Sequence, residues 1–174
     1  MSGVDEAYIN ARRVLLDALD ALVDHRNALI LVGAQAIYLH TGAADLGVSE
    51  FTRDADLALN PALLATAPPL EQTMLAHGFQ PELDQSGKPK PGIWRSLQDN
   101  VEVDLMVPDA VGGSSRRGVN LAGHDHLVAR KVKGLEAVLT DQQHMTIPAL
   151  EPSDLRSVEL AVAGPTALLI AKLY

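Results

Sequence analysis

The chain has 174 residues, of which 47% are hydrophobic, 21% are charged and none is cysteine. This composition suits one globular domain and excludes general disorder, disulfide scaffolds and thiolate chemistry. The net charge of -8 argues against a generic DNA-coating protein, and the absence of a membrane span or signal-peptide pattern leads us to expect a cytoplasmic protein.

The first third of the chain is predicted to alternate helices and strands. Apolar residues recur at helical spacing over residues 7–24, which predicts an amphipathic helix. The apolar run 28–32 ends at Gly33 and is typical of a buried strand, and residues 34–40 are expected to form a helix. Residues 54–59 alternate charged and apolar side chains, which is the period of a strand.

Proline, glycine and polar residues divide the rest of the chain into short elements. Asn60 and Pro61 are a start signal for a helix that Pro68 and Pro69 interrupt and that resumes up to residue 77. The later elements are expected in this order: a loop at 80–92, strands at 93–97 and 101–107 with a turn at 98–100, a flexible segment at 111–118, a helix or strand at 126–134, short strands at 136–139, 145–150 and 157–162, and a last helix at 166–174.

This order of elements indicates an α/β (α+β) fold with a mixed β-sheet and packed helices. We expect residues 1–110 to form the core and residues 111–174 to complete the sheet and add the last helix. The final helix is apolar nearly all round, so we expect a partner protein or a further segment to cover it.

Three aspartates are the candidate metal ligands and catalytic residues. Asp54 and Asp56 are one residue apart in a predicted strand, so both carboxylates lie on the same face. Asp104 lies in the strand 101–107, and it completes a three-carboxylate site if the two strands pair. Oxygen ligands of this kind favour Mg²⁺ or Mn²⁺.

The turn between the first strand and the following helix is a candidate phosphate site. Gly33 lets a phosphate approach the backbone, and the start of the helix at Ala34 offers amides and a favourable dipole. A glycine turn beside a carboxylate pair is the chemistry of metal-dependent nucleotidyl transfer.

Two segments of this sequence resemble the polymerase-β-like nucleotidyltransferase superfamily: Leu31-Val-Gly-Ala-Gln-Ala-Ile-Tyr-Leu-His40 and Phe51-Thr-Arg-Asp-Ala-Asp-Leu57. The Thr-x-Asp-x-Asp form is most similar to AbiEii-like and MenT-like toxins of toxin–antitoxin systems. The serine that usually follows the loop glycine is Ala34 here, and the resemblance breaks off just after Lys172, so we expect a truncated or short relative.

The resemblance implies a nucleotidyltransferase fold and transfer of a nucleoside monophosphate from a nucleoside triphosphate to RNA, with transfer RNA as the known kind of acceptor. It also implies a cognate antitoxin as partner. The residues that it places in the site are, for catalysis and metal binding, Asp54, Asp56 and Asp104, for the triphosphate Lys172, and for nucleotide binding Gly33, Ala34, Thr52 and Arg53.

A locally basic window favours an RNA acceptor. Residues 88–133 hold eight basic and five acidic side chains, whereas the remainder of the chain is strongly acidic. Its densest positive charge is the candidate RNA-binding set of Arg116, Arg117, Arg130, Lys131 and Lys133.

Two other interpretations remain open. The acidic surface also suits transfer to a cationic small molecule such as an aminoglycoside. The alanine at position 34 also fits a catalytically silent module that binds a nucleotide or a partner protein.

Overall fold

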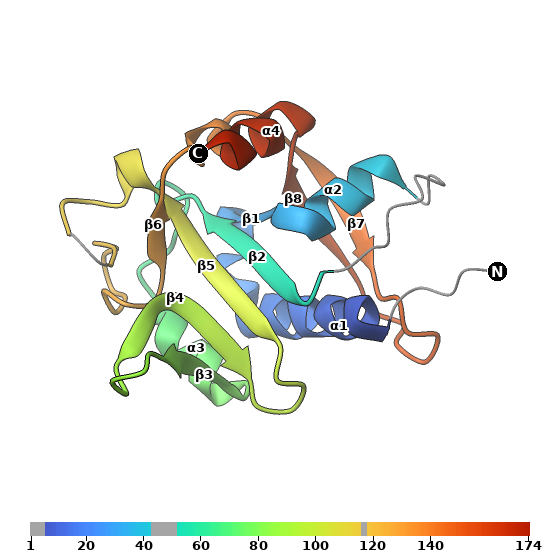
Figure 1. Ribbon diagram of the computed structural model, residues 1–174, viewed down its shortest axis with the longest axis horizontal. Coiled ribbons are helices and arrows are strands. Elements are labelled where there is room, and N and C mark those ends of the chain that lie inside the picture. The colour runs from blue at the N-terminus through green and yellow to red at the C-terminus, as the bar shows by residue number, and fades with distance from the viewer. Residues whose placement is uncertain (1–5, 43–51, 116–117) are drawn as a thin grey trace.

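The computed structural model describes residues 6–42, 52–115 and 118–174 (Figure 1). The strands are β1 (Leu29–Val32), β2 (Asp54–Leu59), β3 (Phe79–Leu83), β4 (Pro89–Ser96), β5 (Glu102–Pro108), β6 (Arg130–Val132), β7 (Gln142–Pro148) and β8 (Ser157–Ala163). The α-helices are α1 (Glu6–Ala21), α2 (Gly33–Thr41), α3 (Leu70–Ala76) and α4 (Pro165–Leu173), and the 3-10 helices are η1 (Val23–Ala28), η2 (Asp109–Val111) and η3 (Glu136–Leu139).

All the strands join one mixed sheet with the order β3-β4-β5-β2-β1-β8-β7, in which β6 also pairs with β5. The centre of the sheet decides where the acidic side chains lie. β2 runs parallel to β5 with Asp56 opposite Asp104, and antiparallel to β1 with Asp56 opposite Val32. β8, from the C-terminal part of the chain, lies between β1 and β7.

Helices cover both faces of this sheet (Figure 1). α1 packs on β2 and β5 and contacts α3, whereas α2 packs on β1 and β2 and contacts α4. Within β2 and β5, residues with odd numbers therefore face one pair of helices and residues with even numbers face the other. Leu57 and Leu105 are fully buried on the α1 face, and Asp56 and Asp104 lie on the α2 face. No helix in the described ranges has the length and apolar character that a membrane crossing requires.

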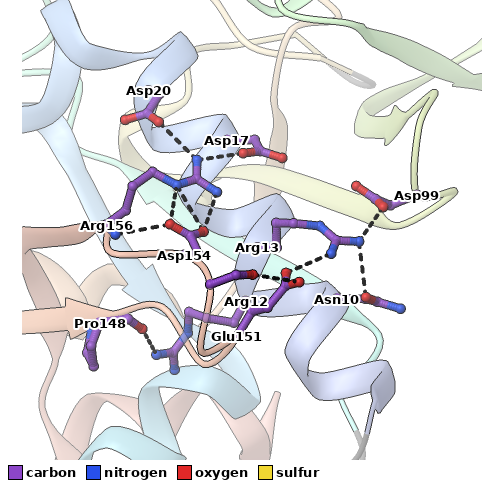
Figure 2. Close-up of polar contacts among 11 residues, drawn as sticks. Asn10, Arg12, Arg13, Asp17, Asp20, Asp99, Pro148, Glu151, Asp154 and Arg156 are labelled. Carbon is purple, nitrogen blue, oxygen red and sulfur yellow. Dashed lines mark hydrogen bonds and ion pairs between the residues drawn. The ribbon is translucent and has the colours of Figure 1, made fainter.

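Arg156 ties α1 to the segment that joins β7 to β8 (Figure 2). Its Nη1 donates to Asp17 at 2.6 Å and to Asp20 at 3.1 Å, and its Nη2 donates to Asp154 at 2.7 Å. One guanidinium thus joins two carboxylates of the helix to one carboxylate of the loop.

The mixed sheet with packed helices confirms the predicted fold class, and several predicted elements are present. The helix at 7–24 is α1 followed by η1, and the segments 28–32, 34–40 and 54–59 are β1, α2 and β2. The strands at 93–97 and 101–107 are the hairpin of β4 and β5. The segments 145–150, 157–162 and 166–174 correspond to β7, β8 and α4, and the undecided segment 126–134 contains the strand β6.

The predicted helix after Asn60 is wrong over its first half. Residues 61–63 form a turn, residues 64–69 have no regular structure, and the helix begins only at Leu70. Pro68 and Pro69 lack the amide hydrogens that a helix interior needs. The Asn60 side chain accepts a hydrogen bond from the amide of Ala62 at 3.1 Å, which stabilises a turn in place of a helix.

The predicted loop at 80–92 is also wrong, because most of it belongs to β3 and β4. Pro81 lies in β3, the edge strand of the sheet, where a missing amide costs least. Pro89 and Pro91 lie in the part of β4 that precedes its pairing with β5. The predicted strand at 136–139 is the 3-10 helix η3, since four mostly apolar residues do not distinguish the two structures.

Candidate active site

Gly33 forms the junction between β1 and α2 and brings the backbone close to Asp56. Its φ is +69°, a conformation that favours glycine. A Cβ added to Gly33 would lie 2.0 Å from Oδ2 of Asp56, so any side chain at this position would displace the carboxylate. The Asp56 carboxylate therefore lies against the first turn of α2.

Asp54 and Asp56 lie on the face of β2 that α2 covers, with the buried Ala55 facing the other way. The Thr52 hydroxyl donates to Oδ1 of Asp54 at 2.6 Å. The Gln35 side chain donates to the backbone carbonyl of Asp54 at 3.0 Å. Both the side chain and the backbone of Asp54 are therefore held in place.

The support for Asp54 extends to α1 through a buried arginine. Arg12 is 1% exposed, and its Nε donates to Oε1 of Gln35 at 2.8 Å. Arg12 also donates to the carbonyl of Pro148 at 2.8 Å (Figure 2). Sequence reasoning did not identify Arg12 or Gln35. The available signal was a charged residue at position 12 among the apolar residues of the α1 pattern.

Asp104 lies beside Asp56 but is bound by an arginine. Arg130 donates from Nε to both carboxylate oxygens of Asp104 at 2.9 Å, and Nη2 also donates to Oδ2. Arg130 was predicted to bind RNA; the structure places it on the third carboxylate instead. In the described part of the chain, no three histidine, aspartate or glutamate side chains are grouped to hold a metal ion.

The Asp56 carboxylate is held in an unfavourable electrostatic environment. Burial, followed by the charges of Asp54 and Asp104, raises its pKa to about 7, and Arg130 opposes this effect. Within the described residues, no hydrogen-bond donor contacts the Asp56 carboxylate. Near pH 7 this side chain therefore exists in both protonation states and gains by acquiring a cation.

A pocket of about 230 Å³ begins at Gly33 and Asp56. Its walls are mostly apolar and come from α2, β5, β6, η3 and α4, as illustrated by Ile37, Val132 and Leu168. Two charged side chains also line the pocket: Lys172 of α4 and Asp56 of β2. The pocket therefore combines an apolar interior with one acidic and one basic side chain. Sequence analysis did not identify its apolar walls, because they come from segments far apart in the chain.

The other predicted site residues are spread around this pocket. Ala34 lies half-buried in the first turn of α2, Thr52 is buried, and Arg53 is exposed directly before β2. Lys133 is exposed directly after β6.

Of the remaining predicted RNA-binding residues, the structure describes Lys131. Lys131 bonds to the carbonyl of Gly113 at 3.0 Å and lies 3.7 Å from Asp109, which engages its charge within the protein. Arg116 and Arg117 lie outside the described residues.

A family model described as nucleotidyltransferase matches residues 11–174. The chain belongs to this nucleotidyltransferase family. The match includes Gly33, the carboxylates of β2 and β5, and Lys172. The comparisons with curated proteins and with solved structures found no match.

The nucleotidyltransferase is accordingly an enzyme that transfers nucleotides, and such enzymes commonly use divalent metal ions. Asp54 and Asp56 fit such an ion, because they offer hard oxygen donors and neither has an arginine partner in the described residues. Asp104 differs, since Arg130 already neutralises it.

Proposed function

We propose that this nucleotidyltransferase moves a nucleoside monophosphate from a nucleoside triphosphate to a hydroxyl of RNA and releases pyrophosphate. The observation that carries the proposal is the Asp56 carboxylate, which lies against Gly33 in the lining of the pocket and has no hydrogen-bond donor among the described residues. Asp54 and Asp56 would hold Mg²⁺ or Mn²⁺, which neutralises the triphosphate and activates the attacking hydroxyl. The α-phosphorus would then gain a bond to the acceptor oxygen and lose its bond to the pyrophosphate oxygen, while the hydroxyl proton would be released to water.

The protein supplies three further groups to the nucleotide. The first amides of α2, after Gly33, face the phosphates with the positive end of the helix dipole. Lys172 on the pocket rim neutralises a phosphate. The apolar pocket walls take the nucleobase, and among the residues that the structure describes, Asp56 and Lys172 supply the polar side chains of the lining.

The acceptor assignment rests on the resemblance to AbiEii-like and MenT-like toxins and on exposed cations beside the site. Arg53 and Lys133 are exposed, and neither forms an ion pair with a described residue. Arg53 directly precedes β2 and Lys133 directly follows β6. Both residues therefore lie beside the site, where an RNA 3′ end would approach. The resemblance also supports a toxin role with a cognate antitoxin, in the cytoplasm where nucleoside triphosphates and transfer RNA are present.

A transfer assay tests this function. The purified enzyme is incubated with each of the four α-labelled nucleoside triphosphates, Mg²⁺ and either total RNA or an aminoglycoside. We expect label in RNA, and a loss of at least about 100-fold in Asp54→Asn and Asp56→Asn. The control Asp24→Asn changes an exposed aspartate beyond α1 and should keep full activity. Nucleotide binding without any transfer would identify a silent binding module.

Transfer to a cationic small molecule is the second candidate function. It is favoured by the ion pairs of Arg130 and Lys131, which leave fewer cations for RNA than the sequence suggested. Label in the aminoglycoside but not in RNA would establish it in place of the RNA acceptor.

A further inference from the structure

The acidic side chains of the site form two pairs with different partners. Asp54 lies opposite Glu102 and Asp56 lies opposite Asp104 in the parallel pairing of β2 with β5. Both carboxylates of β5 are neutralised by arginines, since Glu102 binds Arg95 and Asp104 binds Arg130. The carboxylates of β2 have no such partner among the described residues. When both are ionised, the two carboxylates of β2 carry the charge that one divalent cation compensates.

Arg130 contacts Asp104 and, through Nη2, the sulfur of Met106, which is one of the residues that line the pocket. In the pairing of β5 with β6 it lies opposite Met106, and Met106 lines the pocket together with Val132. Asp104 lies opposite Asp56, so the Arg130 side chain that binds Asp104 lies beside the β2 carboxylates.

The Arg130 side chain has the freedom that a change of partner requires. It is 40% exposed, whereas Asp104 is 14% exposed. Its Nε and Nη2 are occupied by Asp104, but its Nη1 has no partner within the described residues. A guanidinium binds a phosphate with the same bidentate geometry as a carboxylate, so the exchange preserves its hydrogen bonds.

We propose that Arg130 is a positioning residue with two partners, Asp104 without nucleotide and the nucleotide phosphates when nucleotide is bound. In the first position it keeps Asp104 from binding metal. In the second position it releases Asp104, which then joins Asp54 and Asp56 as the third metal ligand. The proposal rests on the proposed function, and it adds that assembly of the three-carboxylate site depends on the nucleotide.

Metal binding without nucleotide tests the first position. Titration calorimetry with Mn²⁺ alone compares wild type with Arg130→Ala, and we expect the variant to bind about tenfold more tightly because Asp104 is released. The double variant Arg130→Ala/Asp104→Asn should bind within about threefold of wild type. A double variant that loses Mn²⁺ binding would show that Asp104 is already a ligand, which overturns the proposal.

Arg95→Ala is the matched control. Arg95 also neutralises a carboxylate of β5, Glu102, but its second partner is Glu82, and its strand β4 contributes no residue to the pocket lining, whereas β6 contributes Val132. We expect it to change Mn²⁺ affinity by less than about threefold. If Arg95→Ala raised the Mn²⁺ affinity as much as Arg130→Ala does, the increase would be a general effect of removing a positive charge. The proposal would then fail.

Nucleotide binding tests the second position. With Mn²⁺ and a nonhydrolysable triphosphate analogue, Arg130→Ala should bind nucleotide about tenfold more weakly than wild type, the opposite sign to its effect on metal alone. The Nε–H NMR signal of Arg130, assigned from its absence in the variant, should shift when the analogue is added. Unchanged nucleotide affinity or an unmoved signal overturns the proposal.

These measurements separate the two proposals. If wild type binds no metal–nucleotide complex, the proposed function itself fails. If wild type binds the complex and Arg130→Ala changes neither affinity, the function stands and the role of Arg130 is rejected. Circular dichroism and the melting temperature establish that each variant is folded, and Arg130→Gln provides a second substitution, one that is polar but uncharged.

Discussion

Asp56 is the carboxylate of this site whose charged form is most strongly disfavoured. Burial and two neighbouring carboxylates raise its pKa from 3.8 to about 7. The Asp56 carboxylate also lies within reach of Gly33, where a Cβ would collide with it. The protein thus holds a carboxylate where its charged form is disfavoured until a cation arrives, a property that suits a metal ligand.

The raised pKa predicts how stability depends on pH when metal is absent. Between about pH 4 and pH 7 the folded protein holds a proton on Asp56 that the unfolded chain has lost, so the free energy of unfolding falls as pH rises through this window. In EDTA at pH 8, the free energy of unfolding of Asp56→Asn should exceed that of wild type by on the order of 2 kcal/mol. At pH 4 the two free energies of unfolding should be equal.

Urea unfolding at these two pH values measures the difference. Glu102→Gln is the matched control, because its carboxylate is paired with Arg95 and its neutralisation should give no gain at pH 8. An Asp56→Asn variant that is no more stable than wild type at pH 8 would contradict the electrostatic account of this residue.

At the scale of elements, α1 is joined by arginines to segments distant in the sequence. Arg156 links it to the loop between β7 and β8, and Arg13 links it to the β4–β5 turn through Asp99 at 2.5 Å (Figure 2). The buried Arg12 continues from the same helix through Gln35 toward the backbone of Asp54. The position of α1 therefore affects the strand that carries the candidate metal ligands.

Loss of the Arg156 contacts should loosen the attachment of α1. Arg156→Met keeps an unbranched apolar stem but removes three ion pairs with Asp17, Asp20 and Asp154. Because these groups are partly exposed, we expect a loss of about 1 kcal/mol in the free energy of unfolding, smaller at high salt.

Thermal unfolding at low and high salt measures this loss. Lys88→Met, in the exposed β3–β4 turn, is the control and should be close to neutral. Equal melting temperatures for Arg156→Met and wild type would show that the Arg156 contacts add nothing to stability.

At the scale of the whole molecule, the net charge of -8 opposes an RNA acceptor, so any RNA must meet local cations. The exposed residues Arg53 and Lys133 lie directly beside β2 and β6, next to the site. Arg130 and Lys131 contribute less, because internal carboxylates engage them.

Salt dependence of RNA binding tests this arrangement. Each phosphate neutralised on a single strand contributes about 0.7 to the slope of log K against log salt, so Arg53→Ala/Lys133→Ala should flatten the slope by roughly 1 to 1.5. Lys88→Ala, remote from the site in sequence and in the sheet, should leave the slope unchanged. A wild-type slope in the double variant would favour the small-molecule acceptor.

The sequence by itself determined the local parts of this protein. Side chains alternate along a strand, so Asp54 and Asp56 had to share a face once residues 54–59 formed β2. The glycine that ends a buried apolar run likewise predicted the β1–α2 junction. These features follow from a few consecutive residues, because periodicity and turn chemistry are local properties of the chain.

Only the tertiary structure decided how the parts of the site combine. The register of β2 with β5 brings Asp104 beside Asp56, and the pairing of β6 with β5 brings Arg130, 26 residues away, onto Asp104. The pocket walls likewise come from α2, η3 and α4. Strand order and register depend on how all helices and strands bury their apolar faces together, so no short segment of the sequence contains that information.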